Sequence, residues 1–221
     1  MTAFLMAIIL WYAFFYTNSK DALVNAGSAN NELILSGEYW RCITALFLHA
    51  DLGHILANAI CIYIFGAALI RHIGPGFSCL MILLGGGLGN LTTAGFYHDE
   101  LHNAIGASTA VFATLASVGV IRAYQRFFQS PARTWRIKPI IAIICIFSMI
   151  GVSTSWTTDM RPYWDGNIDY MAHFLGFLWG GILALSFPLI QRWKSKFTMQ
   201  FLALMISMAL PAAAWYLAIN S

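Results

Sequence analysis

The hydrophobic and polar positions of this chain alternate in blocks as long as membrane helices. Apolar stretches cover residues 2–16, 52–70, 77–96, 104–121, 139–156, 168–190 and 198–217. A helix of about 20 apolar residues can cross the hydrocarbon core of a bilayer. The pattern therefore predicts seven membrane spans, the first of them short. The long connection at residues 17–51 mixes aromatic with polar residues and is expected to fold at the membrane surface.

The composition agrees with this prediction and excludes other classes of protein. Apolar residues make up 59% of the 221 residues and charged residues only 10%, whereas soluble domains carry about 25% charged residues. A soluble globule, a disordered chain and a coiled coil are therefore excluded. The four cysteines lack the spacing of zinc or redox motifs and are expected to pack as small apolar residues. The sequence predicts an all-α, polytopic transmembrane helical bundle with one membrane domain.

The distribution of charge predicts how the spans cross the membrane. All nine acidic residues lie in the odd-numbered connections or at their edges. Nine of the twelve basic residues lie in the even-numbered connections: Arg71, Arg122, Arg126, Arg133, Arg136, Lys138, Arg192, Lys194 and Lys196. Because basic loops stay in the cytoplasm, we expect a cytoplasmic N-terminus and an outer C-terminus. The basic run at 122–138 is interpreted as a topology signal, and no nucleic-acid partner is expected.

Four polar side chains are expected to share one depth near the outer face. With estimated helix starts, His54, Ser108 and His173 lie about 5 to 8 Å inside spans 2, 4 and 6. Asn58 follows His54 by four residues and shares its helix face. A serine beside a neutral histidine can act as nucleophile and general base. The Asn58 amide, the His54 ring and the Ser108 backbone N–H could then hold an oxyanion, and the chemistry needs no metal.

Each of these residues also has a structural interpretation. A single serine in a membrane helix usually bonds a backbone carbonyl, and a buried histidine is more often a structural hydrogen-bonding group. The spacing of Gly176 and Gly180 is typical of close helix packing. His98 and His102 are expected to lie in a solvated turn rather than to bind a metal. The absence of HExxH and of a central acidic pair disfavours zinc and aspartyl proteases.

Three segments carry sequence motifs, and their combination is much more specific than any one of them alone. GEYWRCITALFLHADLGHILAN contains Trp40, Arg41, His49 and the pair His54 and Asn58; IGASTAVF contains Gly106, Ser108 and Phe112; and AHFLGFLWG contains His173, Gly176 and Gly180. In this order they resemble the first outer loop and second helix, the GASGAxF nucleophile motif and the AHxxGxxxG signature of the rhomboid family of intramembrane serine proteases. The resemblance runs from Gly37 to about Gly181.

The resemblance implies a catalytic dyad of Ser108 and His173, with His54, Asn58 and the Ser108 amide holding the oxyanion. It further implies a water-filled cavity that opens to the outside, is capped by residues 157–168 and is approached laterally past span 5. Phe112 would stack against the catalytic histidine. One departure is Thr109, which replaces a glycine of many members and is expected to narrow the site or to add a hydroxyl near the oxyanion.

The sequence therefore predicts a six-span rhomboid-like catalytic core at residues 1–190, and a cytoplasmic connection and additional C-terminal transmembrane helix at 191–221. The expected activity is hydrolysis of peptide bonds in or near transmembrane segments of membrane-protein substrates, without cofactor or metal, in a bacterial plasma membrane. The alternative is a non-catalytic rhomboid-like protein that binds transmembrane partners, although the presence of both Ser108 and His173 argues against it. A transporter is disfavoured because no internal repeat is visible.

Overall fold

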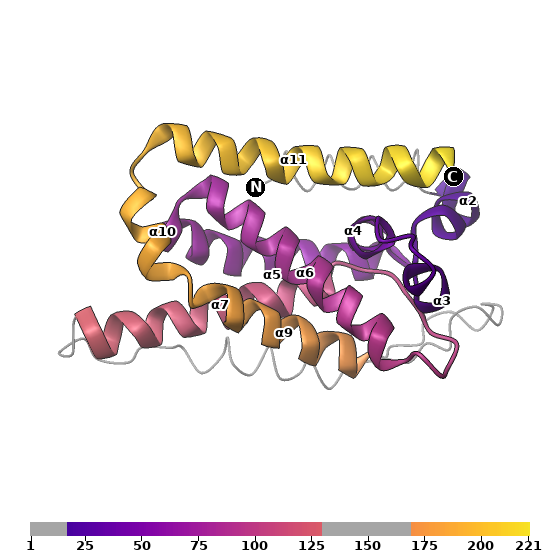
Figure 1. Ribbon diagram of the computed structural model, residues 1–221, viewed down its shortest axis with the longest axis horizontal. Helices are drawn as coiled ribbons and strands as arrows, with labels where there is room; N and C mark the ends of the chain where they lie inside the picture. Colours follow the sequence, from indigo (N-terminus) through magenta and orange to yellow (C-terminus); the bar gives the residue numbers. More distant parts are fainter. Residues whose placement is uncertain (1–16, 130–168) are drawn as a thin grey trace.

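The computed structural model describes residues 17–129 and 169–221, which are mostly helical (Figure 1). Its longer helices are α5 (Leu52–Ile73), α6 (Pro75–Phe96), α7 (Ser108–Tyr124), α9 (Tyr170–Ala184) and α11 (Phe197–Asn220), with α10 (Phe187–Trp193) and the π-helical turn η3 (Gln125–Gln129) at the ends of α9 and α7. The predictions for 2–16, 139–156 and 157–168 fall outside the described residues.

Three of the described helices, α5, α6 and α11, are long and apolar enough to cross a membrane. A fourth span results if α9 and α10 are counted together. The chain is therefore an integral membrane protein, and the full number of seven spans stays a prediction. The first two of these helices agree closely with the predicted stretches at 52–70 and 77–96. Their boundary is sharp because Gly74 adopts φ +82° and Pro75, which lacks an N–H, begins the next helix.

The predicted span at 104–121 starts too early. Helix α7 begins only at Ser108 because the preceding chain is extended: β2 (Asn103–Ala104) pairs antiparallel with β1 (Ala29–Asn30). The chain then turns at Gly106, whose φ of +126° is a conformation that favours glycine. Hydropathy cannot detect this turn, since the residues around it are apolar. Ser108 therefore lies at the very start of its helix and not about 5 to 8 Å inside it as predicted, whereas its depth in the membrane stays a prediction.

The predicted span at 168–190 is not one straight helix. Helices α9 and α10 are bent by 56° at Leu185 and Ser186. Pro188 lies in the first turn of α10, where its ring and missing N–H prevent α9 from continuing through this point. The hydroxyl of Ser186 donates to the carbonyl of Leu183 at 2.6 Å and closes the last turn before the bend.

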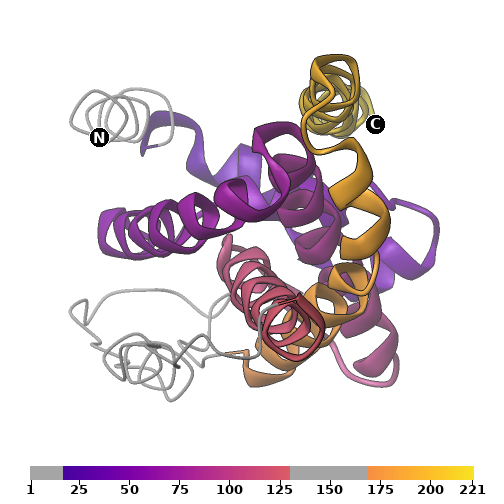
Figure 2. The same cartoon turned by 90° about the vertical axis from the view of Figure 1, so that its left-hand side faces the viewer.

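Helix α7 packs against α9, α6 and α5 (Figure 2). It approaches α9 closely because α9 presents glycines: a Cβ at Gly180 would overlap the backbone carbonyl of Ala113. The buried Ser117 hydroxyl donates to the carbonyl of Gly180 at 2.9 Å and joins the two backbones. The predicted role of the Gly176 and Gly180 spacing in close helix packing is thereby confirmed.

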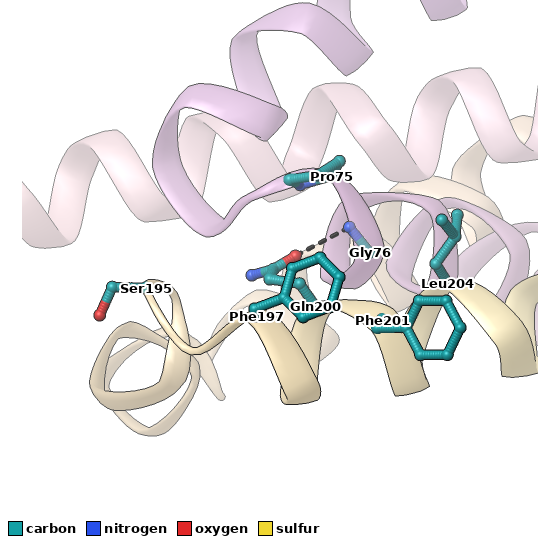
Figure 3. Close-up of a pocket in the computed structure, with 7 residues that line it drawn as sticks. All are labelled: Pro75, Gly76, Ser195, Phe197, Gln200, Phe201 and Leu204. Atoms are coloured by element: carbon teal, nitrogen blue, oxygen red, sulfur yellow. Dashed lines mark hydrogen bonds between the residues drawn. The ribbon is translucent and has the colours of Figure 1, made fainter.

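Helix α11 lies along α6 and is fastened where α6 begins (Figure 3). The side-chain oxygen of Gln200 accepts a hydrogen bond from the backbone N–H of Gly76 at 2.8 Å, and its amide nitrogen donates to the carbonyl of Ile73 at 2.8 Å. At the other end of α11, Trp215 packs with Val24 and Leu48. The last helix therefore contacts the bundle at both of its ends.

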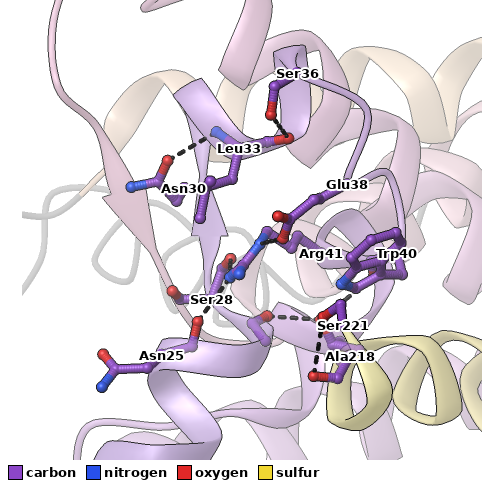
Figure 4. A network of polar contacts seen from close by, with 12 residues as sticks. Asn25, Ser28, Asn30, Leu33, Ser36, Glu38, Trp40, Arg41, Ala218 and Ser221 are labelled. Atoms are coloured by element: carbon purple, nitrogen blue, oxygen red, sulfur yellow. Dashed lines mark hydrogen bonds and ion pairs between the residues drawn. The ribbon is translucent and has the colours of Figure 1, made fainter.

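Residues 17–51 form an ordered cap at the end of the bundle where α5, α7 and α9 begin, which we call the loop end. Its elements are α2 (Thr17–Gly27), β1, α3 (Asn31–Leu35), α4 (Arg41–Thr44) and the 3-10 turn η2 (Ala45–Phe47). Buried Arg41 holds them together: it bonds Glu38 at 2.6 Å and the carbonyls of Asn25 and Ser28 at 3.0 and 3.2 Å (Figure 4). The prediction of a folded connection is confirmed for this segment.

Candidate active site

Ser108 and His173 come from the starts of neighbouring helices at the loop end. Ser108 is the first residue of α7 and is half-buried, whereas His173 is the fourth residue of α9 and is buried. Phe112, one turn after Ser108, places its ring centroid 4.5 Å from that of His173, with the planes tilted by 33°. The predicted contact between Phe112 and His173 is present, and it holds the imidazole on the side of α7 that carries Ser108.

The described contacts include no hydrogen bond between the Ser108 hydroxyl and His173, and Nδ1 of His173 is buried without a hydrogen-bond partner. Catalytic hydrogen bonds are often long in proteins without substrate and tighten when substrate binds. A buried polar nitrogen without a partner is uncommon and costs folding free energy. The imidazole therefore retains hydrogen-bonding capacity beside the serine.

His54 and Asn58 lie against the turn that precedes Ser108. A Cβ on Gly106 would lie 2.7 Å from Nε2 of His54 and 3.7 Å from Nδ2 of Asn58. Glycine is thus required at this position both by its positive φ and by the close approach of the histidine. The Asn58 amide nitrogen is buried and donates to no group in the described part of the chain. Two side-chain donors therefore converge on the backbone of the serine turn.

His49 holds the same turn from the cap. Its ring lies edge-on to His54 with centroids 5.0 Å apart, and its Nε2 accepts a hydrogen bond from the backbone N–H of Ala107 at 3.5 Å. Burial and then the neighbouring His54 lower the pKa of His49 to about 3. The ring is consequently neutral at physiological pH and can accept this hydrogen bond. The Gly106 N–H also donates to the carbonyl of Ala45 at 2.9 Å.

Two other predicted supporting residues, Trp40 and Arg41, belong to the cap. The described polar contacts of Arg41 are all with the cap, and Trp40 directly precedes α4 as its N-cap. The methyl group of buried Thr109 faces Gly89 of α6 and Gly176 of α9. The threonine that replaces the expected glycine thus fills the junction of three helices with its methyl group.

A further histidine, His102, and an aspartate, Asp169, which the sequence motifs did not include, lie beside the site. The carboxylate of Asp169 accepts a hydrogen bond from the backbone N–H of Ala172 at 2.9 Å and caps α9. Its other oxygen lies 2.7 Å from Nε2 of His102. Burial favours a raised pKa for Asp169, but the hydrogen bonds from His102 and Ala172 and the charge of His102 outweigh it, so the pKa is lowered.

The interpretation of His102 as part of a solvated turn is therefore wrong. Its side chain is 17% exposed, whereas the neighbouring pair His98 and Asp99 is 62% and 84% exposed. The ring of Tyr97 stacks on His102 with centroids 4.3 Å apart and planes 4° apart. Among the described residues, no cluster of His, Cys, Asp and Glu side chains could hold a metal ion. The sequence signal for this arrangement is Asp169 itself, a helix-capping residue one turn before His173.

Comparison with known proteins agrees with the motifs. Residues 36–192, well over half of the chain, match the Rhomboid domain. YdcA of Bacillus subtilis (strain 168) is 28% identical over 194 residues, covering 86% of this chain and 81% of YdcA. The rhomboid protease GluP of the same organism is 28% identical over 206 residues, covering 93% of this chain and 37% of GluP. RHOMBOID-like protein 7 of Arabidopsis thaliana is 27% identical over 166 residues, covering 75% of this chain and 48% of that protein. The chain therefore belongs to the rhomboid family.

Proposed function

We propose that this protein is an intramembrane serine protease that hydrolyses peptide bonds in or near transmembrane segments of membrane-protein substrates. Ser108 is the nucleophile and His173 the general base. The observation that carries the proposal is the junction at the loop end, where Phe112 holds His173 beside the Ser108 helix while His54 and Asn58 approach Gly106 from the other side.

The arrangement supports a two-step acyl transfer. His173 takes the proton of the Ser108 hydroxyl as the oxygen attacks the peptide carbonyl, and a tetrahedral oxyanion forms. His173 then gives this proton to the leaving amine, and the acyl group stays on Ser108. Water, deprotonated by the same imidazole, attacks the acyl group; the substrate acid leaves and the proton returns to Ser108.

The oxyanion has three donors within reach of the serine turn. The Asn58 amide nitrogen is buried and has no hydrogen-bond partner among the described residues, and the His54 ring adjoins Gly106. The Ser108 N–H belongs to the first turn of α7, where N–H groups have no partner within their own helix. The positive end of the helix dipole favours negative charge at the same point. Donors that already face the developing charge stabilise a transition state without reorganising.

The distribution of charge supports an orientation in which the loop end faces outside. The positive-inside rule then places the N-terminus in the cytoplasm and the active site at the outer side, and a bacterial plasma membrane is the compartment we propose. Within this scheme residues 1–190 form the catalytic core and 191–221 the added connection and helix. Substrates should carry helix-breaking or small residues near the outer membrane face, because a helical backbone must open before its peptide bond can be attacked.

The experiment is cleavage of a reporter transmembrane substrate by the purified protein in lipid, comparing the wild type with Ser108→Ala and His173→Ala. Ser207→Ala is the matched control, since Ser207 lies on α11 and donates to a carbonyl of its own helix. We expect a product from the wild type and the control only. A wild type that makes no product and does not react with a fluorophosphonate probe would overturn the proposal in favour of the non-catalytic alternative.

A further inference from the structure

We propose that Asp169, held in place by His102, is a positioning residue for the general base: its carboxylate fixes the first turn of α9 and stabilises the imidazolium that His173 becomes during acyl transfer. The inference rests on the proposed function of His173. Asp169 is the N-cap of α9 and precedes His173 by four positions, so it lies one helical turn before the base.

The two oxygens of the Asp169 carboxylate face different neighbours. One accepts from the Ala172 N–H at 2.9 Å, and the other lies 2.7 Å from Nε2 of His102. The backbone carbonyl of Asp169 accepts from the N–H of His173 itself at 3.1 Å. The aspartate and the base are thus joined through one turn of backbone, and the carboxylate cannot rotate without losing a partner.

His102 is itself fixed, so it can hold the carboxylate. Its backbone N–H donates to the side-chain oxygen of Asn31 at 2.9 Å, and its carbonyl accepts from the Asn31 N–H at 3.0 Å. The Asn31 amide also donates to the carbonyl of Glu100 at 2.7 Å. With Tyr97 stacked on its ring, His102 links the cap to the start of α9.

Among the described residues, charges act on His173 from two sides. Asp169 lies on its own helix and His54 comes from α5. The imidazolium formed during acyl transfer is attracted by the Asp169 carboxylate. It is repelled by His54 whenever His54 is protonated. Because the Asp169 carboxylate is 17% exposed, water screens it only partly, and its negative charge favours the step in which His173 accepts the serine proton.

The test compares two carboxylate-histidine pairs of the same outer region. Asp169→Asn removes the charge but keeps a side chain that caps a helix equally well. Asp99→Asn removes the same charge from the exposed pair with His98 and is the matched control. Steady-state cleavage of the reporter and the rate of fluorophosphonate labelling are measured together with the melting temperature.

We expect Asp169→Asn to lower kcat and the labelling rate about tenfold, with KM and the melting temperature unchanged, because a tenfold rate change corresponds to about 1.4 kcal/mol in the barrier. Asp99→Asn should change neither rate. His102→Gln should lower kcat in the same way, and the double variant of His102 and Asp169 should be no slower than Asp169→Asn alone, as expected for groups that act as a unit.

The inference is overturned if folded Asp169→Asn keeps a wild-type kcat, or if Asp99→Asn is slowed equally. A change confined to KM or to the melting temperature would also overturn it, since that is what a purely structural cap would produce. If the wild type shows neither cleavage nor labelling, the proposed function and this inference are overturned together. If the wild type is active and Asp169→Asn is equally active, only this inference is overturned.

Discussion

Two buried asparagines of the bundle should respond in opposite ways to the same substitution. Asn58 and Asn90 are 8% and 5% exposed. Within the described part of the chain the amide nitrogen of Asn58 has no hydrogen-bond partner, whereas that of Asn90 donates to the carbonyl of Cys42 at 3.0 Å. If Asn58 is an oxyanion donor, its unused amide is the functional group, and Asn58→Ala should remove activity without removing stability.

The magnitudes separate the two roles clearly. Loss of one oxyanion donor lowers kcat by about 100-fold to 1,000-fold. A buried polar group without a partner costs about 1 to 3 kcal/mol of stability. Removing the Asn58 amide relieves this cost and so compensates for the packing contacts that the substitution loses. We therefore expect the free energy of unfolding of Asn58→Ala to stay within about 1 kcal/mol of the wild type. Asn90→Ala instead leaves the buried Cys42 carbonyl without its donor and should lower the free energy of unfolding by about 1 to 3 kcal/mol.

The assay pairs reporter cleavage in lipid with thermal unfolding in detergent for both variants. We expect Asn58→Ala to be nearly inactive and as stable as the wild type. Asn90→Ala should be less stable yet close to wild type in kcat at a temperature where it is folded. The reasoning is refuted if Asn58→Ala melts as early as Asn90→Ala and loses activity only in proportion to its unfolded fraction, because Asn58 would then only fasten two helices together.

Three further results are expected. Gln200→Ala removes the amide that bonds Gly76 and should lower the free energy of unfolding by about 2 kcal/mol in detergent melts, and an unchanged melting temperature would contradict this. Gly180→Ala drives a methyl group into the backbone of Ala113, so the monodisperse fraction in size-exclusion chromatography should fall sharply; a normal yield would disprove the close contact. Burial lowers the pKa of His49 from 6.5 to about 3. The contribution of neutral His49 to the free energy of unfolding is therefore present above pH 6.5 and is lost as the pH falls toward 3, by up to about 1.4 kcal/mol per pH unit. His49→Phe should reduce this dependence of the free energy of unfolding on pH, as measured in unfolding titrations.

Hydropathy predicted α5, α6 and α11 well, because each is a long apolar run with clear boundaries. It failed where local geometry interrupts an apolar run. Gly106 reverses the chain before Ser108, and Pro188 bends the chain after α9, yet both lie within apolar stretches. Length and polarity alone cannot locate such interruptions, since they arise from backbone conformation.

The candidate site shows the same division between local and distant information. The motifs around Ser108 and His173 lie within short segments and could be read directly, and the contact of Phe112 with His173 follows the resemblance. The pairing of His102 with Asp169 could not be read, because the two are far apart in sequence and His102 stands among polar residues typical of a solvated turn. Only the folded chain brings them together.

The packing of α11 has a consequence for the order of assembly during biosynthesis. Trp215 completes a cluster with Val24 and Leu48, and Leu48 directly precedes His49, which bonds the serine turn. Of the described helices, α11 is the last to leave the ribosome. While it is still being translated, the loop beside the serine turn lacks its contact with Trp215, so we expect the candidate site to complete its packing only after α11 has been made.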